Sequence, residues 1–264
     1  IASYILENYD KAAFMTASRL GILAGVSEST VVRFASELGY DGYPSMQRAL
    51  QDMIRSRLTS TQRIQAAGDM YQNVLPAVIQ SDIDKLRQML SHGRQDEFDR
   101  VVDKIMTSRH VYILGVRSSS FVAGYLHFYM HLLSENVTLI QSNAAGEMFE
   151  QMLRMGPGDV LIAISFPRYS KVTINTVKFA RDRGAEIIAI TDNELSPVCQ
   201  LSQAALLAPC EMISFVDSMV APLSLINALL VALSNRYGAD VSTTFAELEN
   251  IWNEYGVFGK MDDE

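Results

Sequence analysis

The sequence predicts two parts of different fold class: an all-α region, followed by a doubly wound α/β domain whose parallel sheet has about five strands. Up to about Ser108, apolar residues recur at helical spacing and runs of β-branched residues are absent. From His110 onward, short apolar runs alternate with stretches of helical length, which is typical of a parallel sheet covered on both faces. The expected strands begin near residues 110, 137, 159, 186 and 204.

The change of pattern also suggests the domain boundaries. We place an all-α domain at residues 1–57, a helical linker at residues 58–100 and the α/β domain at residues 101–264. The linker is polar and helical in pattern and has no Gly/Ser-rich or Pro-rich run, so we expect a helical coupling rather than a flexible one. Since the chain opens at Ile1 inside an expected helix, we expect native residues before it to be missing.

Composition narrows the class of protein. Hydrophobic residues make up 48% and charged residues 20% of the 264, as in ordinary globular proteins and unlike disordered ones. The sequence contains no run of about eighteen uncharged apolar residues, so we expect no membrane span. Cys199 and Cys210 lack the spacing of a metal or redox motif, which suits a reducing compartment. We therefore expect a cytoplasmic protein without a metal or another cofactor.

The net charge of -8 argues against general affinity for nucleic acids, but the charge is unevenly distributed. Residues 1–57 carry six Lys and Arg against six Asp and Glu, so this part is neutral and the remainder carries the whole excess. This asymmetry permits an anion-binding head on an acidic body without demonstrating one.

The most informative stretch of the first part runs from Met15 to Phe34. Thr16 and Ser27 are placed to cap two helices, because their hydroxyls accept from free amides of a first turn. Gly25 lies between these helices, where a tight turn needs positive φ, and Gly21 lies where the helices approach closely. The expected inward-facing residues are Leu20, Val26, Val31 and Phe34. This spacing fits a helix-turn-helix.

The second helix of this motif, from Glu28 to Leu38, is then expected to enter the major groove of double-stranded operator DNA. Arg33 suits a guanine edge or a phosphate, and the hydroxyls suit phosphate contacts. The predicted DNA-contacting residues are Thr16, Ser27, Ser29, Thr30, Arg33, Tyr40 and Tyr43. The alternative is a plain helical hairpin in an all-α interaction domain. The neutral charge of residues 1–57 gives the hypothesis of DNA binding no electrostatic support.

Two expected strands end in hydroxyl-bearing loops that precede helices. The strand from His110 leads through Gly115 to Ser118, Ser119 and Ser120, ahead of a helix expected near Phe121. The strand from Asp159 leads to Ser165 and Ser170, again ahead of a helix. Free amides and helix dipoles make such junctions anion sites, and parallel strand ends share one edge of the sheet. The alternative is that the serines only cap the helices.

In this order of parts, and in the loops Gly115-Val-Arg-Ser-Ser and Ile164-Ser-Phe-Pro-Arg-Tyr-Ser, the chain resembles the RpiR family of transcription regulators, whose C-terminal half is a sugar isomerase (SIS) domain. The first phosphate loop of SIS domains, glycine-any-glycine-any-serine, then falls on Gly115 to Ser119, and the second, serine-any-serine-glycine-any-threonine or serine, on Ser165 to Ser170. The chain departs from these patterns at Arg117, Pro167 and Arg168. Either the arginines replace lost donors with charge-assisted bonds, or the pocket has changed its ligand.

The resemblance implies a regulator of sugar-catabolism genes that responds to a sugar phosphate or a related metabolite. The expected effector-binding residues are Arg117, Ser118, Ser119, Ser120, Glu147, Ser165, Arg168 and Ser170. The alternative role for Glu147 is a solvated carboxylate at a helix start, and for the loop cations it is exposure to solvent.

SIS domains also occur in phosphosugar isomerases, so an enzyme is the alternative function. Isomerisation needs a positioned base, for which Glu147, His127 and His131 are the candidates. The two histidines lie in a mostly apolar stretch, which favours core or interface positions. We therefore expect a sensor with no catalytic residues. Effector binding would change the spacing of recognition helices in a homodimer or tetramer. The candidate interface helices are residues 220–233 and 245–255.

Overall fold

A computed structural model describes residues 1–55, 59–67, 73–141, 145–210 and 214–258. The chain divides into two compact units. The first comprises Ile1–Ser81 with Glu211–Ser218, and the second comprises Asp82–Cys210 with Met219–Glu264. No helix within the described ranges has the length and apolarity to cross a bilayer. The units are described separately below.

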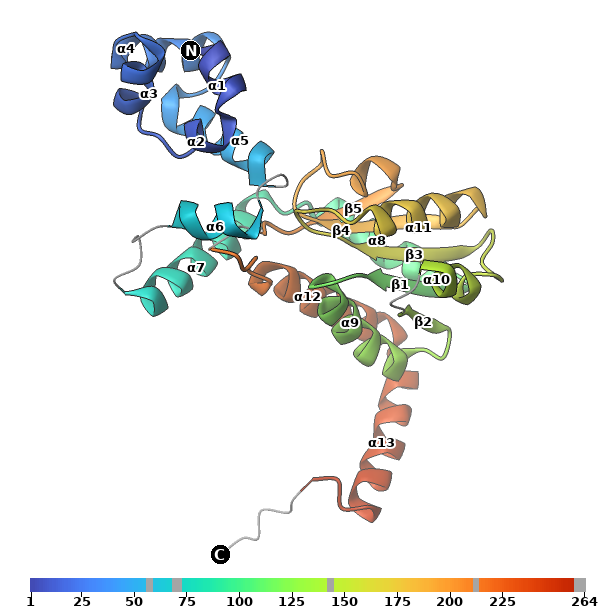
Figure 1. Ribbon diagram of the computed structural model, residues 1–264. Helices are drawn as coiled ribbons and strands as arrows, with labels where there is room; N and C mark the ends of the chain where they lie inside the picture. Colours follow the sequence, from blue (N-terminus) through green and yellow to red (C-terminus); the bar gives the residue numbers. More distant parts are fainter. Residues whose placement is uncertain (56–58, 68–72, 142–144, 211–213, 259–264) are drawn as a thin grey trace, which may run out of the picture. The chain divides into compact units, whose positions relative to one another are not determined.

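In the first unit, the described part of residues 1–81 is built from helices joined by short connections (Figure 1). Its helices are α1 (Ala2–Glu7), α2 (Tyr9–Ala12), α3 (Ala17–Ala24), α4 (Glu28–Glu37), α5 (Gly42–Arg55), α6 (Ser60–Ala67) and the start of α7 (Val74–His92). A small core joins α2, α3, α4 and α5, and its buried members are Ala12, Leu20, Val31, Ala35, Tyr43 and Met46. Val26 and Phe34 pack against this core at partial exposure, as the helix-turn-helix spacing predicts.

The turn between α3 and α4 has the predicted geometry. Thr16 and Ser27 are the N-caps of the two helices, and each hydroxyl accepts an amide hydrogen bond of 3.2 Å from the residue three positions on. Gly25 has a φ of 71°, a conformation that a side chain disfavours. A Cβ on Gly21 would lie 2.8 Å from the Val26 carbonyl oxygen, so the helices approach as closely as a glycine allows. The predicted caps and turn are confirmed.

The second unit contains the predicted parallel sheet of five strands. The strands are β1 (His110–Gly115), β2 (Val137–Ile140), β3 (Asp159–Ile164), β4 (Glu186–Thr191) and β5 (Ala204–Leu207), in the spatial order β2-β1-β3-β4-β5. Every neighbouring pair is parallel. The sheet carries helices on both faces, and its strands therefore read as continuous apolar runs.

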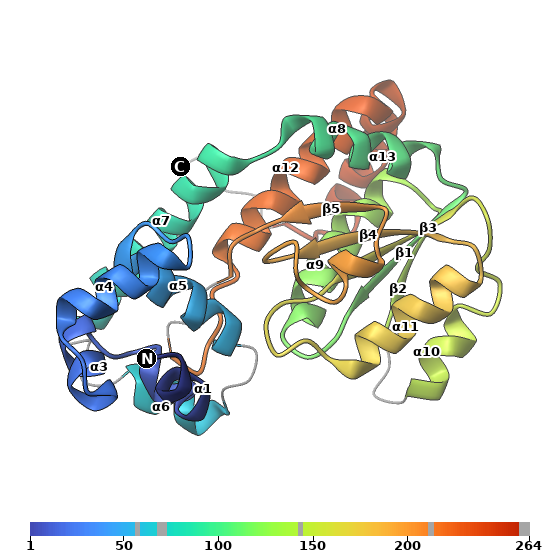
Figure 2. The same ribbon diagram turned by 90° about the horizontal axis from the view of Figure 1, so that it is seen from above.

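Successive residues of each strand point to opposite faces and enter two separate cores. On one face, Val111 and Ile113 pack with the helices α8 (Gln95–Thr107), α9 (Ser119–Leu133) and α12 (Val220–Tyr237). On the other, Tyr112 and Leu114 pack with α10 (Ala145–Gln151) and α11 (Lys171–Asp182). Figure 2 shows α10 and α11 together on one side of the strands. The doubly wound architecture is confirmed.

At the amino end of the sheet, Arg109 and Asp159 join the starts of β1 and β3. Arg109 donates from Nε to Oδ1 at 2.8 Å and from Nη2 to Oδ2 at 2.6 Å, and the Gly156 amide donates to the same carboxylate at 2.9 Å. Burial alone would raise the pKa of Asp159, but these donors hold it below the ordinary value. This pair lies at the end of the sheet opposite to the hydroxyl-bearing loops that follow β1 and β3.

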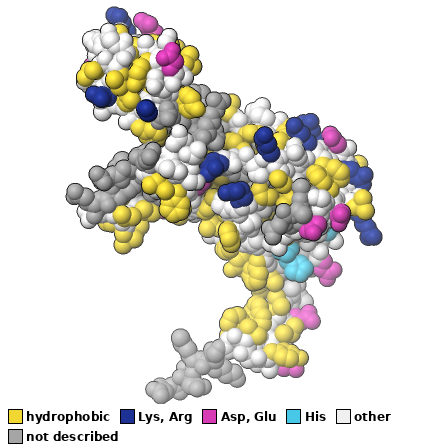
Figure 3. All heavy atoms as spheres, in the orientation of Figure 1, with side chains coloured by type: hydrophobic (Ala, Val, Ile, Leu, Met, Phe, Trp, Pro, Cys, Tyr) yellow, Lys and Arg dark blue, Asp and Glu magenta, His cyan; other side chains and the backbone are white. Residues whose placement is uncertain are grey.

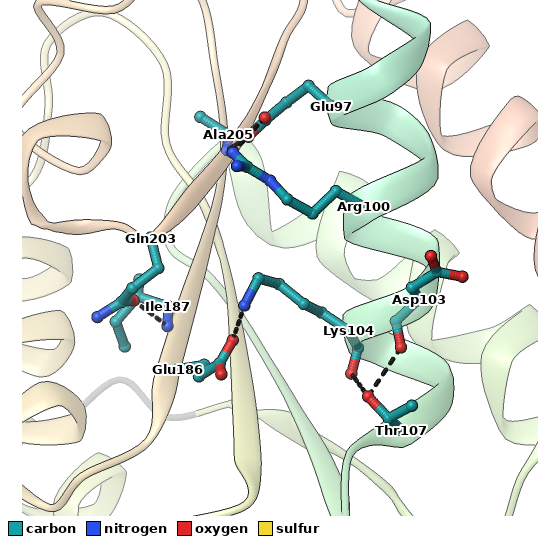
Figure 4. A network of polar contacts seen from close by, with 9 residues as sticks. All are labelled: Glu97, Arg100, Asp103, Lys104, Thr107, Glu186, Ile187, Gln203 and Ala205. Atoms are coloured by element: carbon teal, nitrogen blue, oxygen red, sulfur yellow. Dashed lines mark hydrogen bonds and ion pairs between the residues drawn. The ribbon is translucent and has the colours of Figure 1, made fainter.

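Helix α8 covers the outer edge of β5 (Figure 4). Glu97 accepts from the outward-pointing amide of Ala205 at 3.0 Å and also pairs with Arg100. Lys104 pairs with Glu186 at the start of β4. Because α8 begins at Gln95, the last residues of the predicted linker 58–100 already belong to the α/β unit. The sequence periodicity could not separate this covering helix from a connecting one.

Candidate functional site

The two serine loops lie at adjacent strand ends. Gly115 of β1 and Ile164 of β3 are paired in register, so the loops that follow leave the same carboxyl edge side by side. The chain goes from β1 outward to β2 and then returns to β3 on the other side of β1, which makes this the switch point of the sheet. Ligands of open α/β folds bind in the crevice that such a switch point opens.

In the first loop, Arg117 adopts a left-handed conformation with a φ of 56°. Ser118 follows in the right-handed region as N-cap of α9, and its side chain makes no capping bond. Among the described residues, no carbonyl accepts from the amides of Arg117 and Ser118. A left-handed residue beside a right-handed one forms a concavity of amides that suits an anion. Ser120 stabilises the loop itself, since its hydroxyl donates a hydrogen bond of 2.6 Å to the Arg117 carbonyl.

Helix α9 begins at Ser119, two residues earlier than predicted, so Ser119 and Ser120 belong to its first turn. This turn packs directly on the end of β1. A Cβ on Gly115 would lie 2.4 Å from the Ser119 carbonyl oxygen and 2.8 Å from the Ala123 Cβ. The close approach that only glycine permits is what places Ser119 at the strand end, where it is 6% exposed.

The second loop resembles the first in two respects, a buried serine and a left-handed arginine. Ser165 is buried directly after β3, and Arg168 has a φ of 65°. Ser170 is the N-cap of α11 and accepts from the Val172 amide at 3.2 Å, so one predicted effector residue serves as a cap in this structure. Thr173, in the first turn of α11, is 1% exposed and its hydroxyl has no hydrogen-bond partner in the described structure. An unmade bond of this kind is costly in a folded protein.

Sequence reasoning missed a polar cluster that anchors the second loop. Tyr169 donates its hydroxyl to Asp192 Oδ1 at 2.8 Å, and Asn193 donates to the other carboxylate oxygen at 2.7 Å. Thr191 donates to Asp192 at 3.1 Å. Burial raises the pKa of Asp192, against the opposing effect of these donors, and burial beside Asp192 raises the pKa of Tyr169. The signal was present, because three polar residues follow β4 directly.

The remaining candidates of the α/β unit are placed as follows. Glu147 is exposed in the first turn of α10, which follows β2 at the same edge. His127 and His131 stack with ring centroids 5.7 Å apart on α9, and no third metal ligand joins them in the described ranges. Burial, and secondly His131, lower the pKa of His127.

In the helix-turn-helix unit, most predicted DNA contacts are accessible. Ser29 and Arg33 are exposed on α4, and Arg33 forms only a surface pair of 3.8 Å with Glu37. Tyr40 is 37% exposed. Tyr43 corrects the prediction: it is 5% exposed and its hydroxyl donates to the Met15 carbonyl at 2.7 Å. The ring packs in the small core because α5 begins at Gly42, one residue earlier, and turns it inward.

A hollow of about 760 Å³ lies elsewhere, beside the outer edge of β5. Its lining includes Glu97, Arg94, Gln203 and Leu225, and it includes none of the predicted site residues. The switch-point site is therefore an open edge rather than this hollow. Buried hydroxyls of Ser119 and Ser165, and the amides of Arg117 and Ser118, lie at that edge.

Comparisons with known proteins agree with the division of the chain. A model of the helix-turn-helix domain of the rpiR family matches residues 1–57, and a SIS domain model matches residues 104–232. The HTH-type transcriptional regulator HexR of Pseudomonas aeruginosa is 24% identical over 251 residues, which cover 91% of this chain and 85% of that protein.

Two solved structures share the fold. One is the sugar isomerase domain of an RpiR transcription factor from Sphaerobacter thermophilus, with a TM-score of 0.64 and 23% identity over 68% of this chain and 99% of that chain. The other is the NanR protein of Vibrio vulnificus complexed with ManNAc-6P, with a TM-score of 0.64 and 21% identity over 98% of this chain and 92% of that chain.

Proposed function

Since this chain joins an rpiR-family helix-turn-helix domain to a SIS domain and so belongs to the RpiR family, we propose that it is a DNA-binding transcriptional regulator of carbohydrate catabolism, controlled by a phosphorylated sugar. The observation that carries the proposal is the adjacency of the two serine loops at the switch point of the sheet. A separate helix-turn-helix unit with an accessible second helix supplies the DNA reader.

The phosphoryl group binds between the two loops. Buried hydroxyls from Ser119 and Ser165 approach from the ends of β1 and β3, and the amides of Arg117 and Ser118 supply further donors. Neutral donors aimed from a helix start stabilise a phosphate monoester without a full counter-charge. The relative whose structure contains ManNAc-6P supports a sugar phosphate as the ligand class. Glu147, in the first turn of α10 on the same edge, is the proposed partner of the sugar hydroxyls.

On the DNA side, Ser29, Thr30 and Arg33 lie on α4, where Ser29 and Arg33 are exposed and Thr30 is half-buried. Arg33 reads a guanine edge or holds a phosphate, and the hydroxyls of Thr16 and Ser27 contact phosphates at the starts of α3 and α4. Tyr40 reaches the backbone from the turn after α4. The chain works in the cytoplasm, where its operator is.

Turnover of the sugar is not part of this function. The candidate bases His127 and His131 lie on α9, with His131 in its last turn and therefore far along the helix from Ser119 at its start. The name of the HexR relative is that of a regulator. A purified protein that interconverted glucose 6-phosphate and fructose 6-phosphate at enzymatic rates would replace this proposal with the isomerase alternative.

A homodimer would couple the two sites. The outward face of α9 carries four exposed aromatic residues, Phe121, Tyr125, Phe128 and Tyr129. Hydrophobic side chains gather over this region and over α13 (Ala239–Glu254) in Figure 3. We infer that this aromatic face meets a second copy of the chain. By contrast, most apolar residues of the predicted interface helix 220–233 pack in the core of the α/β unit.

The DNA function is tested with matched arginine variants. A labelled duplex selected from random sequences is titrated with the full chain and followed by fluorescence anisotropy. Arg33→Ala is expected to weaken binding about tenfold or more, since a bidentate base contact contributes about 1–3 kcal/mol. Arg87→Ala is the control, because Arg87 is likewise exposed on a helix and paired with a near neighbour. Equal loss in both variants would contradict the assignment of α4.

The effector function is tested by thermal unfolding of the full chain with sugar 6-phosphates. Bound ligand raises the unfolding midpoint by mass action. We expect Ser119→Ala and Ser165→Ala to lose this rise, and Ser91→Ala, a serine at the exposed end of α7, to keep it. A rise that survives both site variants would place the ligand elsewhere.

The oligomer is tested by light scattering. Phe128→Lys, at a side chain that is 61% exposed, is expected to halve the mass without lowering the unfolding midpoint of the isolated protomer. An unchanged mass would move the interface away from α9.

A further inference from the structure

We propose that the effector carries a second anionic group besides its phosphoryl group, and that Arg117 and Arg168 bind it; this inference rests on the proposed function. Each of the two loops carries one of these arginines. Both have left-handed backbone, with φ values of 56° and 65°, and no other non-glycine residue of the described chain has positive φ. They are also two of the positions at which the chain departs from the glycine-rich SIS patterns.

A purely structural role for these positions calls for glycine. Left-handed backbone is accessible to glycine at no steric cost and is unfavourable for a residue with a Cβ. Each loop therefore places a long cationic side chain on left-handed backbone that does not need one. Lys171, an exposed cation at the start of α11, shows that positive charge at this edge does not require left-handed backbone. What the arginines add is a pair of guanidinium groups that extend from the loops after β1 and β3.

Their placement brings both side chains within reach of one small molecule. Arg117 follows the end of β1 by two residues and Arg168 follows the end of β3 by four, and these strands are neighbours spaced about 4.8 Å apart. Both side chains are exposed. No ion pair within the described residues engages Arg117. In a chain of net charge -8, these arginines bring two positive charges to the carboxyl edge, on which Glu147 also lies.

A second observation concerns a buried hydroxyl in the first turn of α11. Thr173 heads the buried face of α11, which continues with Thr176, Val177 and Ala180 along the sheet. It is therefore the member of that face nearest the carboxyl edge, and its buried hydroxyl has no partner among the described residues. With Ser119 and Ser165 it forms a set of neutral donors beneath the loops, suited to one phosphoryl group.

The neutral donors and the arginines then have different tasks. The buried hydroxyls hold the phosphoryl group, and the exposed guanidinium groups meet a carboxylate or second phosphoryl group at the mouth. The planar fork of a guanidinium matches the two oxygens of either anion, and such charge-assisted bonds are about twice as strong as neutral ones. The pair thus sets specificity rather than general phosphate binding. Sugar phosphates that end in a neutral hydroxyl or carbonyl leave the arginines without this contact.

The test measures the affinity of the full chain, by calorimetry, for four probes: inorganic phosphate, glucose 6-phosphate, 6-phosphogluconate and fructose 1,6-bisphosphate. Glucose 6-phosphate and 6-phosphogluconate differ in a carboxylate at one end, so their ratio reports the second anionic group. We expect a doubly anionic probe to bind about tenfold or more tightly than glucose 6-phosphate, as one charge-assisted contact predicts. Arg117→Gly and Arg168→Gly should each shrink this ratio, with glucose 6-phosphate affinity retained.

Glycine is also the informative replacement for stability. Because it fits left-handed backbone, the variants should unfold at an unchanged or higher temperature without ligand, which a structural role for the arginines would not produce. Arg181→Gln, at the far end of α11, controls for the loss of one surface charge. Equal affinity of the wild-type chain for singly and doubly anionic probes, or variants whose ratio matches the control, would overturn the inference. Absence of binding by all four probes would instead refute the proposed function on which it rests.

Discussion

Replacing Gly115 by alanine tests the geometry that creates the effector site. Gly115 ends β1, and the first turn of α9 lies against it. An added Cβ would lie 2.4 Å from the Ser119 carbonyl oxygen, and real Cβ contacts essentially never fall below 3.0 Å. The backbone of the α9 start must therefore move outward by at least about 0.6 Å, since the obstructing atom is backbone rather than a flexible side chain. Ser119 and the free amides before it move as well.

The magnitude follows from this displacement. Forced repacking of a close contact costs about 1–3 kcal/mol, and a second contact with Ala123 Cβ at 2.8 Å puts Gly115→Ala toward the upper part of that range. Hydrogen bonds that are lengthened by 0.5 Å or more lose most of their strength, so we expect sugar-phosphate affinity to fall at least about tenfold. Operator binding by the separate helix-turn-helix unit should survive but no longer respond to the sugar.

Gly124→Ala is the matched control, because Gly124 lies on the same helix and a Cβ there meets nothing within 4 Å. Alanine should stabilise α9 by about 0.5–1 kcal/mol through helix propensity. Both variants are followed by urea unfolding and by the rise in unfolding midpoint with sugar 6-phosphates. If Gly115→Ala kept wild-type stability and wild-type ligand response, the packing of α9 on β1 would not be what positions the site.

Three further predictions follow from single contacts. Gly21→Ala should destabilise the helix-turn-helix unit by about 1–3 kcal/mol and weaken operator binding, since its Cβ would lie 2.8 Å from a backbone oxygen. Thermal unfolding followed by circular dichroism and operator binding followed by anisotropy check this, while sugar-phosphate binding should not change. Asp159 has a lowered pKa in the folded chain, so its contribution to stability is present above the unfolded value of about 3.8 and is lost as the pH falls further. Asp159→Asn should cost about 1–3 kcal/mol at pH 7 and make unfolding midpoints less sensitive to acid below about pH 4, and an equally acid-sensitive variant would assign that sensitivity to other carboxylates. Thr173→Val removes an unpaired buried hydroxyl, so it should leave stability equal or higher while lowering sugar-phosphate affinity; a variant that loses stability but keeps affinity would show that the hydroxyl is bonded within the fold.

The features that local pattern controls could be predicted. The cap residues Thr16 and Ser27, the left-handed Gly25 and the five strands are all confirmed, because each depends on a few neighbouring residues or on a simple periodicity. The hydroxyl-bearing loops were visible for the same reason, since they follow buried runs directly. That these runs form one parallel sheet, with both loops on one edge, follows from the general rules for alternating strands and helices.

Other features depend on which elements become neighbours. Tyr43 was predicted to reach DNA from a turn, but α5 starts at Gly42 and carries the ring into the small core, where its hydroxyl donates a hydrogen bond to the carbonyl of Met15, 28 residues earlier. The cluster around Asp192 forms because β4 lies beside β3, so that Tyr169 meets it across 23 residues. No local sequence pattern predicts the contact between Tyr169 and Asp192.

The sequence by itself determined where helices and strands begin, which residues cap them, and that two strands end in anion-binding chemistry, because hydrogen-bonding capacity and periodicity are local properties of the chain. Only the tertiary structure decided that β1 and β3 are adjacent, that α9 packs on Gly115, and that Arg117 and Arg168 keep left-handed backbone where glycine would be expected. The adjacency of β1 and β3 depends on pairing between residues about 50 positions apart, and such pairing is chosen by the whole fold rather than by any one segment.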